Sequence, residues 1–170
     1  MQVKLVEIQG RQEKSQICEA ILRALPAWFG IEQAIVDYVN DVQTMPFCGV
    51  MMDDNPIGFV AINDHNSSTA EIHVMGVLEN HQWHGIGRQL VQWCEQHCMQ
   101  TNREFLTVKT LDESRENGEY ARTRLFYLSM GFIPLEVFPE LWGPENPCLM
   151  LAKHLCQFSD AESESSHPNL

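Results

Sequence analysis

The chain has 170 residues, of which 44% are hydrophobic, and a formal net charge of −12 at pH 7. This length and hydrophobic content fit one folded domain with one core. The negative charge disfavours a nucleic-acid partner, whose phosphates demand a basic surface, and mildly favours a cationic ligand.

The two ends of the sequence bear on location and domain limits. The first residues, Met1-Gln2-Val3-Lys4, do not form a basic region followed by an apolar one, and no apolar run approaches the roughly 18 residues that span a bilayer. We therefore expect a cytoplasmic protein with no membrane partner. Residues 158–170 are polar and acidic and cannot bury a core, so we expect a folded domain over 1–157 and a disordered acidic tail after it.

The cysteines are expected to be reduced residues of the core. No two of them form a Cys-x-x-Cys pair, which argues against a disulfide framework or a zinc site. One pair lies a helical turn apart and should share a buried face. The six are Cys18, Cys48, Cys94, Cys98, Cys148 and Cys156.

The hydrophobic pattern of the first half predicts a strand, two helices and a meander of strands. A turn at Asp53-Asp54-Asn55-Pro56 separates two strands of a hairpin, and residues 63–68 turn into the next strand. The expected strands are 3–8, 47–52, 57–62 and a run from Glu71, and the expected helices are 12–25 and 31–42.

The second half predicts two more helices and three more strands. Apolar residues repeat every 3.6 positions from Ile86 to Cys98, as in a helix packed on a sheet. A later helix ends where Gly131 takes the C-cap position. The expected helices are 86–98 and 120–130, and the expected strands are 105–111, 132–138 and 148–153, the last two joined by the connection 139–147.

The segment 71–90 combines a strand, a glycine loop and the start of a helix. Gly85 and Gly87 let backbone N–H groups approach an anion, and the following helix adds its positive N-terminal end. A pyrophosphate-bearing cofactor is the natural occupant. The loop lacks the Gly-Lys-Ser/Thr of a Walker A motif, and Leu90 stands where a Rossmann fingerprint needs its third glycine.

The motif Gln82-x-x-Gly85-x-Gly87, placed about five residues after a strand, resembles the phosphate loop of the GNAT superfamily of acyl-CoA-dependent N-acetyltransferases. The resemblance also takes in Ala70-Glu71-Ile72 and Val77 upstream and the Phe-Tyr-Leu-Ser-Met-Gly-Phe segment downstream. With the order of elements, it covers most of residues 1–157. It implies an α+β fold with a central, mostly antiparallel, splayed sheet of about six to seven strands flanked by four helices.

The same resemblance implies acetyl-CoA as co-substrate and a set of residues that bind it. The backbone of Met75 and Val77 should pair with the pantetheine arm, and the Met75 N–H is the expected donor to the oxyanion. Arg88 can add positive charge beside the pyrophosphate. The expected binding residues are Met75, Gly76, Val77, Gln82, Trp83, His84, Gly85, Ile86, Gly87 and Arg88.

Acetyl transfer to an amine needs a base for the amine proton, a donor for the oxyanion and an acid for the departing thiolate. Resemblance to the protein-lysine branch of the superfamily implies Glu71 as the base; alternatively, Glu71 orders water or pairs structurally. Tyr127 matches a tyrosine placed near the thioester sulfur and is the candidate acid; alternatively, it packs beside Phe126. Here Tyr120 replaces a common asparagine, and Thr123 replaces a common alanine.

Histidines offer a further choice. His73 shares a strand face with Glu71 and either assists proton transfer or packs as a hydrogen-bonded core residue. His81 and His84 are three residues apart, but no third ligand is near them in the sequence and the loop fits phosphate, so no metal is expected.

The acceptor should be a primary amine of a small molecule or a peptide. Trp28, Phe29 and Trp142 lie in segments that line the acceptor cleft in this fold; alternatively, they cap the core. We expect a cationic amine, guided by acidic residues, between the loop 26–30 and the connection 139–147. Two other functions stay open, a non-catalytic acyl-CoA-binding sensor and a scaffold that forms a homodimer through the Trp142 connection. The presence of both Glu71 and Tyr127 favours catalysis.

Overall fold

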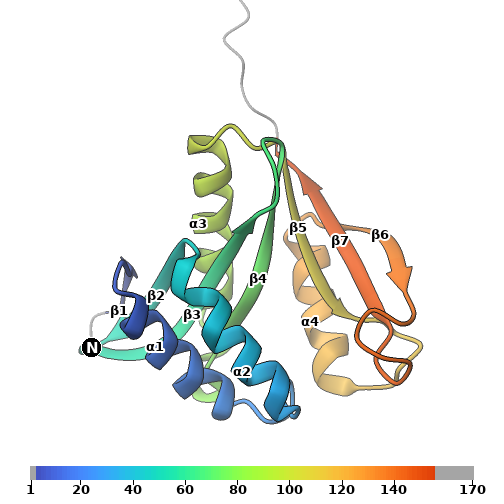
Figure 1. Ribbon diagram of the computed structural model, residues 1–170, viewed down its shortest axis with the longest axis horizontal. Helices are drawn as coiled ribbons and strands as arrows, with labels where there is room; N and C mark the ends of the chain where they lie inside the picture. Colours follow the sequence, from blue (N-terminus) through green and yellow to red (C-terminus); the bar gives the residue numbers. More distant parts are fainter. Residues whose placement is uncertain (1–2, 156–170) are drawn as a thin grey trace, which may run out of the picture.

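The computed structural model describes residues 3–155, so the predicted tail at 158–170 and Cys156 lie outside the described residues. Its elements alternate as the sequence predicts (Figure 1). They are β1 (Val3–Glu7), α1 (Arg11–Arg23), α2 (Glu32–Asp41), η1 (Val42–Thr44), β2 (Phe47–Met52), β3 (Asn55–Asp64), β4 (Thr69–Val77), η2 (Glu79–His81), α3 (Ile86–Gln100), β5 (Phe105–Leu111), α4 (Gly118–Ser129), β6 (Ile133–Phe138) and β7 (Cys148–His154).

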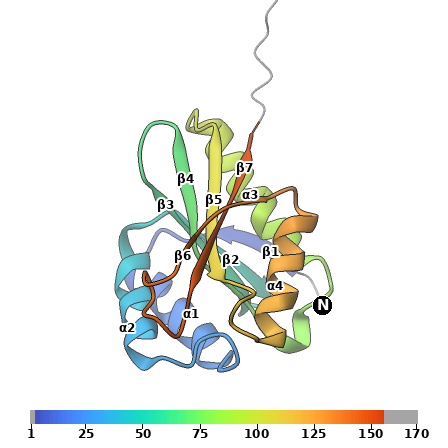
Figure 2. The same ribbon diagram turned by 90° about the vertical axis from the view of Figure 1, so that its right-hand side faces the viewer.

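Seven strands form one sheet in the order β1-β2-β3-β4-β5-β7-β6. All neighbours pair antiparallel except β4 and β5, which are parallel. Helices α1 and α2 cover one face of the sheet and α3 and α4 the other (Figure 2). The expected mixed fold, with a mostly antiparallel sheet and four helices, is confirmed.

The sheet opens into a wedge between β4 and β5. Their pairing runs only from Thr69 with Phe105 to Ile72 with Val108, after which the strands diverge. Figure 1 shows the gap widening toward the end of the sheet where α4 begins. Beyond Ile72, the edge of β4 that faces β5 therefore has no strand partner and its backbone groups are open to a ligand.

A bulge at His73 reverses the side-chain alternation of β4. Ile72 pairs with Ile62 and Val74 with the adjacent Ala61, so His73 is one extra residue in β4. A bulge changes which face later residues occupy. Ile72 packs in the core under α3 and α4, whereas Val74 packs in the core under α1 and α2.

The bulge also decides which candidate residues share a face. His73 contacts the Tyr38 ring of α2 and so lies on the face of the sheet opposite Ile72. Glu71, which directly precedes Ile72 in the strand, also lies on this opposite face. The predicted shared face of Glu71 and His73 is therefore confirmed. Met75 packs against the core under α3 and α4 instead. Simple alternation would have placed Glu71 and Met75 on the same face.

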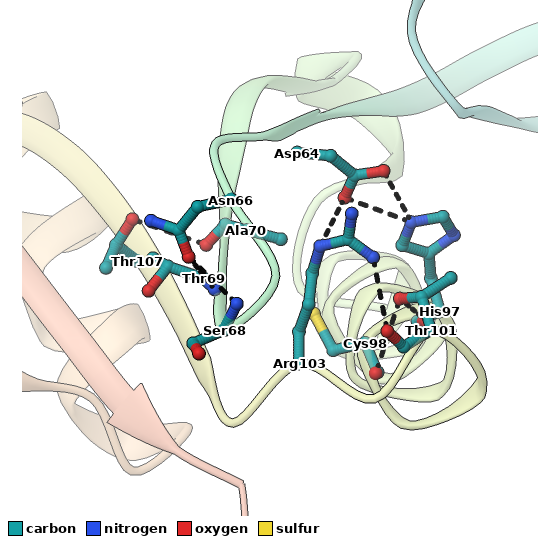
Figure 3. A network of polar contacts seen from close by, with 10 residues as sticks. All are labelled: Asp64, Asn66, Ser68, Thr69, Ala70, His97, Cys98, Thr101, Arg103 and Thr107. Atoms are coloured by element: carbon teal, nitrogen blue, oxygen red, sulfur yellow. Dashed lines mark hydrogen bonds and ion pairs between the residues drawn. The ribbon is translucent and has the colours of Figure 1, made fainter.

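A polar network fixes the narrow end of the wedge (Figure 3). Asp64, at the end of β3, forms ion pairs with His97 of α3 at 3.3 Å and with Arg103 at 3.2 Å. In the β3–β4 turn, the Asn66 side chain accepts hydrogen bonds from the backbone N–H groups of Ser68 and Thr69. These contacts hold β3, β4 and the C-terminal end of α3 together, at the opposite end of α3 from the glycine loop.

The cysteines of the described chain are free thiols. Cys94 and Cys98 are both fully buried on the inner face of α3, as their spacing predicts. Burial raises the pKa of the Cys98 thiol to about 11, so this thiol stays protonated and unreactive at neutral pH. Within residues 3–155, no helix is both long enough and apolar enough to cross a membrane.

Candidate active site

A cavity of about 360 Å³ occupies the open end of the wedge. Its wall is built from the α1–α2 loop, α2, β4, the loop before α3, the first turn of α3, β5, α4 and the β6–β7 connection. We call the part of the wall that contains the residues predicted to bind the cofactor the cofactor side; it is formed by Met75–Val77, Gln82, Trp83, Gly85, Gly87 and Arg88. The acceptor side is formed by Trp28, Phe29, Tyr38, His73, Lys109, Thr110, Tyr120 and Trp142.

Hydrogen bonds hold the loop before α3 against the end of β4. The Gln82 side-chain amide donates to the Val77 carbonyl at 3.0 Å, and the His84 ring Nδ1 lies 2.7 Å from the Gln82 carbonyl. Gly85 is the N-cap of α3 and has φ of +80°, a backbone conformation that glycine adopts without steric cost. These contacts fix the direction in which α3 begins.

The first turn of α3 differs from those of the other helices. Among the four α-helices of residues 3–155, only α3 has neither a side-chain cap nor an acidic residue in its first turn, and it carries Arg88 there. In α4, by contrast, the Asn117 side chain accepts from two backbone N–H groups, and Glu119 lies in the first turn. The open N–H groups of α3 and the helix dipole therefore favour an anion from outside the chain.

Gly87 has two reasons to lack a side chain. A Cβ at this position would lie 3.2 Å from the Phe126 ring of α4, tighter than an ordinary contact. The same absence leaves the first turn of α3 open to a phosphate group. Ile86, between the glycines, is buried in the core, so only its backbone can contribute to an anion site.

Glu71 is buried and already has two partners. Its carboxylate lies 2.5 Å from the Lys109 ammonium of β5 and 2.7 Å from the His65 ring Nε2. Only 6% of the residue is exposed, and it does not line the cavity, whereas Lys109 does. The pattern of the sequence carries no sign of this pair, because the two residues come from strands that meet only in the fold.

Tyr127 is buried in the cavity wall, between the rings of Phe126 and Phe132. Burial raises the pKa of its phenol well above the usual value for tyrosine, so the hydroxyl stays protonated at neutral and mildly alkaline pH. The ring packs beside Phe126, as one of the two alternatives expects, and because the residue also borders the cavity the acid role stays a prediction.

His73, the bulged residue of β4, lines the cavity. Its ring Nε2 lies 3.0 Å from the Asp41 carboxylate at the end of α2, and its ring meets Tyr38 edge to face. The tautomer is assigned from this contact, in which an N–H donates to the carboxylate. The Asp41 carboxylate is therefore occupied by His73.

The three aromatic residues predicted for the acceptor cleft all line this one cavity. Trp28 is also bonded to α4: its indole N–H donates to the Thr123 hydroxyl at 3.1 Å, and the Tyr120 hydroxyl donates to the Trp28 carbonyl at 2.7 Å. The two residues that depart from the family pattern, Tyr120 and Thr123, thus share one partner. Sequence analysis marked both departures without identifying what they bind.

The structure brings most of the predicted site residues to the cavity. Met75, Gly76, Val77, Gln82, Trp83, Gly85, Gly87, Arg88 and Tyr127 line it together with Trp28, Phe29 and Trp142. Glu71, His84 and Ile86 do not. Sequence analysis did not single out Tyr38, Lys109 and Thr110, which also line the cavity. Within residues 3–155, no cluster of three or more His, Cys, Asp or Glu side chains is placed to hold a metal ion.

No aspartate or glutamate is among the described residues that line the cavity. The expectation that acidic residues guide the acceptor therefore finds no support in its wall. The charged side chains that do line it are Lys109, Arg88 and Arg122. The net charge of the whole chain did not reveal this local arrangement, because total charge says nothing about where each charge lies.

Comparison with known proteins gives one family. Residues 15–132 match the family model described as Acetyltransferase (GNAT) family. No curated protein sequence matches the chain significantly.

Solved structures of low sequence identity share the fold. An aminoglycoside 6'-N-acetyltransferase from Enterococcus faecium has 18% identity and a TM-score of 0.70, over 94% of this chain and all of its own. The ribosomal-protein-S18-alanine N-acetyltransferase from Escherichia coli has 12% identity and a TM-score of 0.71, over 96% of this chain and all of its own. A GNAT family acetyltransferase from Elizabethkingia anophelis, solved with acetyl-CoA bound, has 15% identity and a TM-score of 0.69, over 90% and 98%.

Proposed function

Because the chain belongs to the acetyltransferase (GNAT) family, we propose that it is an N-acetyltransferase that transfers an acetyl group from acetyl-CoA to a primary amine, by direct attack within a ternary complex. One observation supports this most strongly. The uncapped N-terminus of α3, the unpaired edge of β4 and the buried phenol of Tyr127 border the same cavity. These three features would supply a cofactor-binding site, an oxyanion donor and an acid at one place.

The residues of the cofactor side fit acetyl-CoA. The open N–H groups of Gly87 and Arg88 would hold the pyrophosphate, because no side chain of the α3 first turn caps them. Backbone groups of Met75 and Val77 would pair with the amides of the pantetheine arm, because β4 has no strand partner there. When bound, acetyl-CoA would supply the thioester, whose C–S bond breaks after the new C–N bond has formed.

Two groups of the chain would serve the thioester. The Met75 N–H would donate to the oxygen that becomes negative as the amine attacks the carbonyl carbon. The Tyr127 phenol would give its proton to the departing thiolate. Burial raises the pKa of this phenol, which keeps it protonated at neutral pH and also makes it a weaker acid. Both roles suit their positions in the cavity wall.

The proton of the attacking amine would reach Glu71 through a water molecule. Direct contact is not favoured, because Glu71 is buried beneath Lys109 and does not line the cavity. A carboxylate held by Lys109 and His65 is also a weaker acceptor than a free one, since an opposite charge favours its ionised form. This second point favours the alternative function, a non-catalytic acyl-CoA-binding sensor that needs only the cofactor side.

One experiment separates the two functions. Acetyl-CoA is incubated with the protein and a panel of primary amines, while free thiol and acetylated product are both measured. Stoichiometric thiol and acetylamine, above the rate without protein, support the transferase. If acetyl-CoA raises the melting temperature but no amine in the panel yields product, the sensor is the better reading.

Two further expectations remain proposals. A homodimer is supported by apolar side chains exposed along the edge strand β6, namely Ile133, Leu135 and Val137, with Leu125 and Leu128 of α4 also exposed. Such an edge invites pairing with a second copy, and a mass measurement in solution would test it. The cytoplasmic location stays a prediction from the sequence.

A further inference from the structure

We infer that the acceptor carries its primary amine on an aromatic or apolar body with no second positive charge, and that it is not a polycation such as a polyamine or an aminoglycoside. The inference rests on the proposed function and names the substrate class of that same cavity. Four features of the acceptor side carry it: aromatic rings, polar groups already bonded within the protein, carboxylates that are already paired, and one buried hydroxyl without a partner.

The acceptor side is largely aromatic. Five rings line it, from the α1–α2 loop, α2, α4 and the β6–β7 connection: Trp28, Phe29, Tyr38, Tyr120 and Trp142. The polar ends of two of these rings bond within the protein, since the Trp28 indole N–H donates to Thr123 and the Tyr120 hydroxyl donates to the Trp28 carbonyl. What these two residues offer a ligand is therefore mainly apolar surface, which binds flat apolar groups and single ammonium groups.

Two carboxylates that contact side chains of the acceptor side already have partners within the protein. Glu71 is paired with Lys109, and Asp41 is paired with the ring of His73. In both pairs the basic side chain lines the cavity and the carboxylate does not. A polycation bound here would lose its water without gaining an anionic partner and would face the Lys109 ammonium, so its binding is unfavourable.

Thr110 adds a buried polar side chain to the acceptor side. It is 2% exposed and lines the cavity, and its hydroxyl is one of two buried side-chain polar atoms without a hydrogen bond within residues 3–155. The other, Arg103 Nε, forms the ion pair with Asp64 at the narrow end of the wedge. A buried hydroxyl without a partner is costly, so a ligand that bonds it gains affinity. The acceptor's amine is the group this hydroxyl would bind.

The test compares aromatic monoamines with polycations in the thiol-release and product assay. Phenethylamine and tryptamine represent the inferred class, and spermidine and kanamycin represent polycations. We expect kcat/KM for the aromatic monoamines to exceed that for either polycation by about tenfold or more, the scale of one or two aromatic contacts. The melting temperature with acetyl-CoA is measured in parallel.

Two variants test the parts of the wall separately. Thr110→Val keeps the shape of the side chain and removes the hydroxyl, so we expect the free protein to melt at a higher temperature, while KM for the aromatic amine rises by about three- to tenfold. Lys109→Gln uncovers Glu71, so the ratio of kcat/KM for spermidine to that for phenethylamine should rise within that variant. This ratio cancels any effect on the chemical step. Leu125→Ala, an exposed change on the outer face of α4, serves as the control.

The outcomes are distinct. Equal or faster acetylation of spermidine or kanamycin overturns the inferred substrate class and leaves the transferase intact. A Thr110→Val protein with raised melting temperature and unchanged KM shows that the hydroxyl does not meet the acceptor, and overturns that part of the inference. If acetyl-CoA binds and no amine is acetylated, the proposed function fails and this inference fails with it.

Discussion

The indole N–H of Trp28 donates a hydrogen bond to the hydroxyl of Thr123, at 3.1 Å, and so joins the α1–α2 loop on one face of the sheet to α4 on the other. The Tyr120 hydroxyl adds a second bond to the backbone of the same tryptophan. All three residues line the cavity. The loop that bears Trp28 is therefore anchored to the helix that bears Tyr127. A substitution in one of these segments should affect the other.

Removing the hydrogen bond between the Trp28 and Thr123 side chains should weaken acceptor binding more than cofactor binding. Trp28→Phe keeps an aromatic ring and removes the donor, and Thr123→Val keeps the shape and removes the acceptor. Each should raise the acceptor KM several-fold, and each should cost about 1 kcal/mol of stability. In a double-mutant cycle the two changes should be strongly non-additive, because they remove one bond. Additive effects would show that the bond does not position Trp28.

Substitution of Gly87, on the cofactor side, should have a clear effect on acetyl-CoA binding. Acetyl-CoA should raise the melting temperature, because it binds the folded state, and free adenine nucleotides should raise it less. Gly87→Val should abolish this shift, since its side chain meets the Phe126 ring and blocks the first turn of α3. Gly118→Ala is the matched control, because a Cβ there meets nothing within 4 Å. A full shift in the Gly87 variant would mean that the phosphate does not bind at this turn.

Periodicity was enough to predict the four α-helices and the central strands, because these elements bury one face and the apolar residues mark it. The short helix η2 (Glu79–His81) was not predicted. The ends of the helices depend on capping residues rather than on periodicity. Helix α4 begins at Gly118, two residues earlier than expected, because the Asn117 side chain caps its first N–H groups. Asparagine at that position is a recognisable start signal. Gly131 was expected at the C-cap, but the C-cap of α4 is Met130 and Gly131 follows it, with a φ of +89° that ends the helix.

The parts of the site that escaped prediction are those made by residues far apart in the sequence. Lys109 reaches Glu71 across 38 positions, and Tyr120 reaches Trp28 across 92. The bulge at His73 could not be predicted either, because the alternation of apolar and polar residues in a strand does not reveal an extra residue. The glycine loop was readable because its function depends on local backbone geometry.

The ion pair beneath the cavity makes Glu71→Gln informative. The change preserves shape but leaves Lys109 without its charge partner, so we expect a stability loss of about 1–3 kcal/mol. If Glu71 receives the amine proton, the rate should fall at neutral pH and recover partly as rising pH deprotonates the amine in solution. Lys109→Met is the comparison, since it disturbs the same pair without removing the carboxylate. A pH–rate profile of Glu71→Gln parallel to that of the unaltered protein would remove Glu71 from the proton path.

Tyr127→Phe tests whether the phenol acts as the acid. Because the phenol is buried, the same variant should also change how the stability of the protein depends on pH. The variant loses only a hydroxyl, so acetyl-CoA should still raise the melting temperature, while turnover falls by about ten- to a thousandfold. The folded state raises the pKa of this phenol. Its contribution to stability is therefore present below the unfolded tyrosine pKa of about 10 and is lost as pH rises above it.

It follows that the stability of the unaltered protein should decline more steeply above pH 10 than that of Tyr127→Phe, which has no proton to lose there. Denaturant unfolding of both proteins between pH 8 and about pH 11 measures this difference. One outcome is that Tyr127→Phe keeps its turnover and loses less stability above pH 10 than the unaltered protein. This outcome would identify Tyr127 as a buried packing residue between Phe126 and Phe132. Reduced turnover with unchanged acetyl-CoA binding would assign the departing thiolate's proton to the phenol.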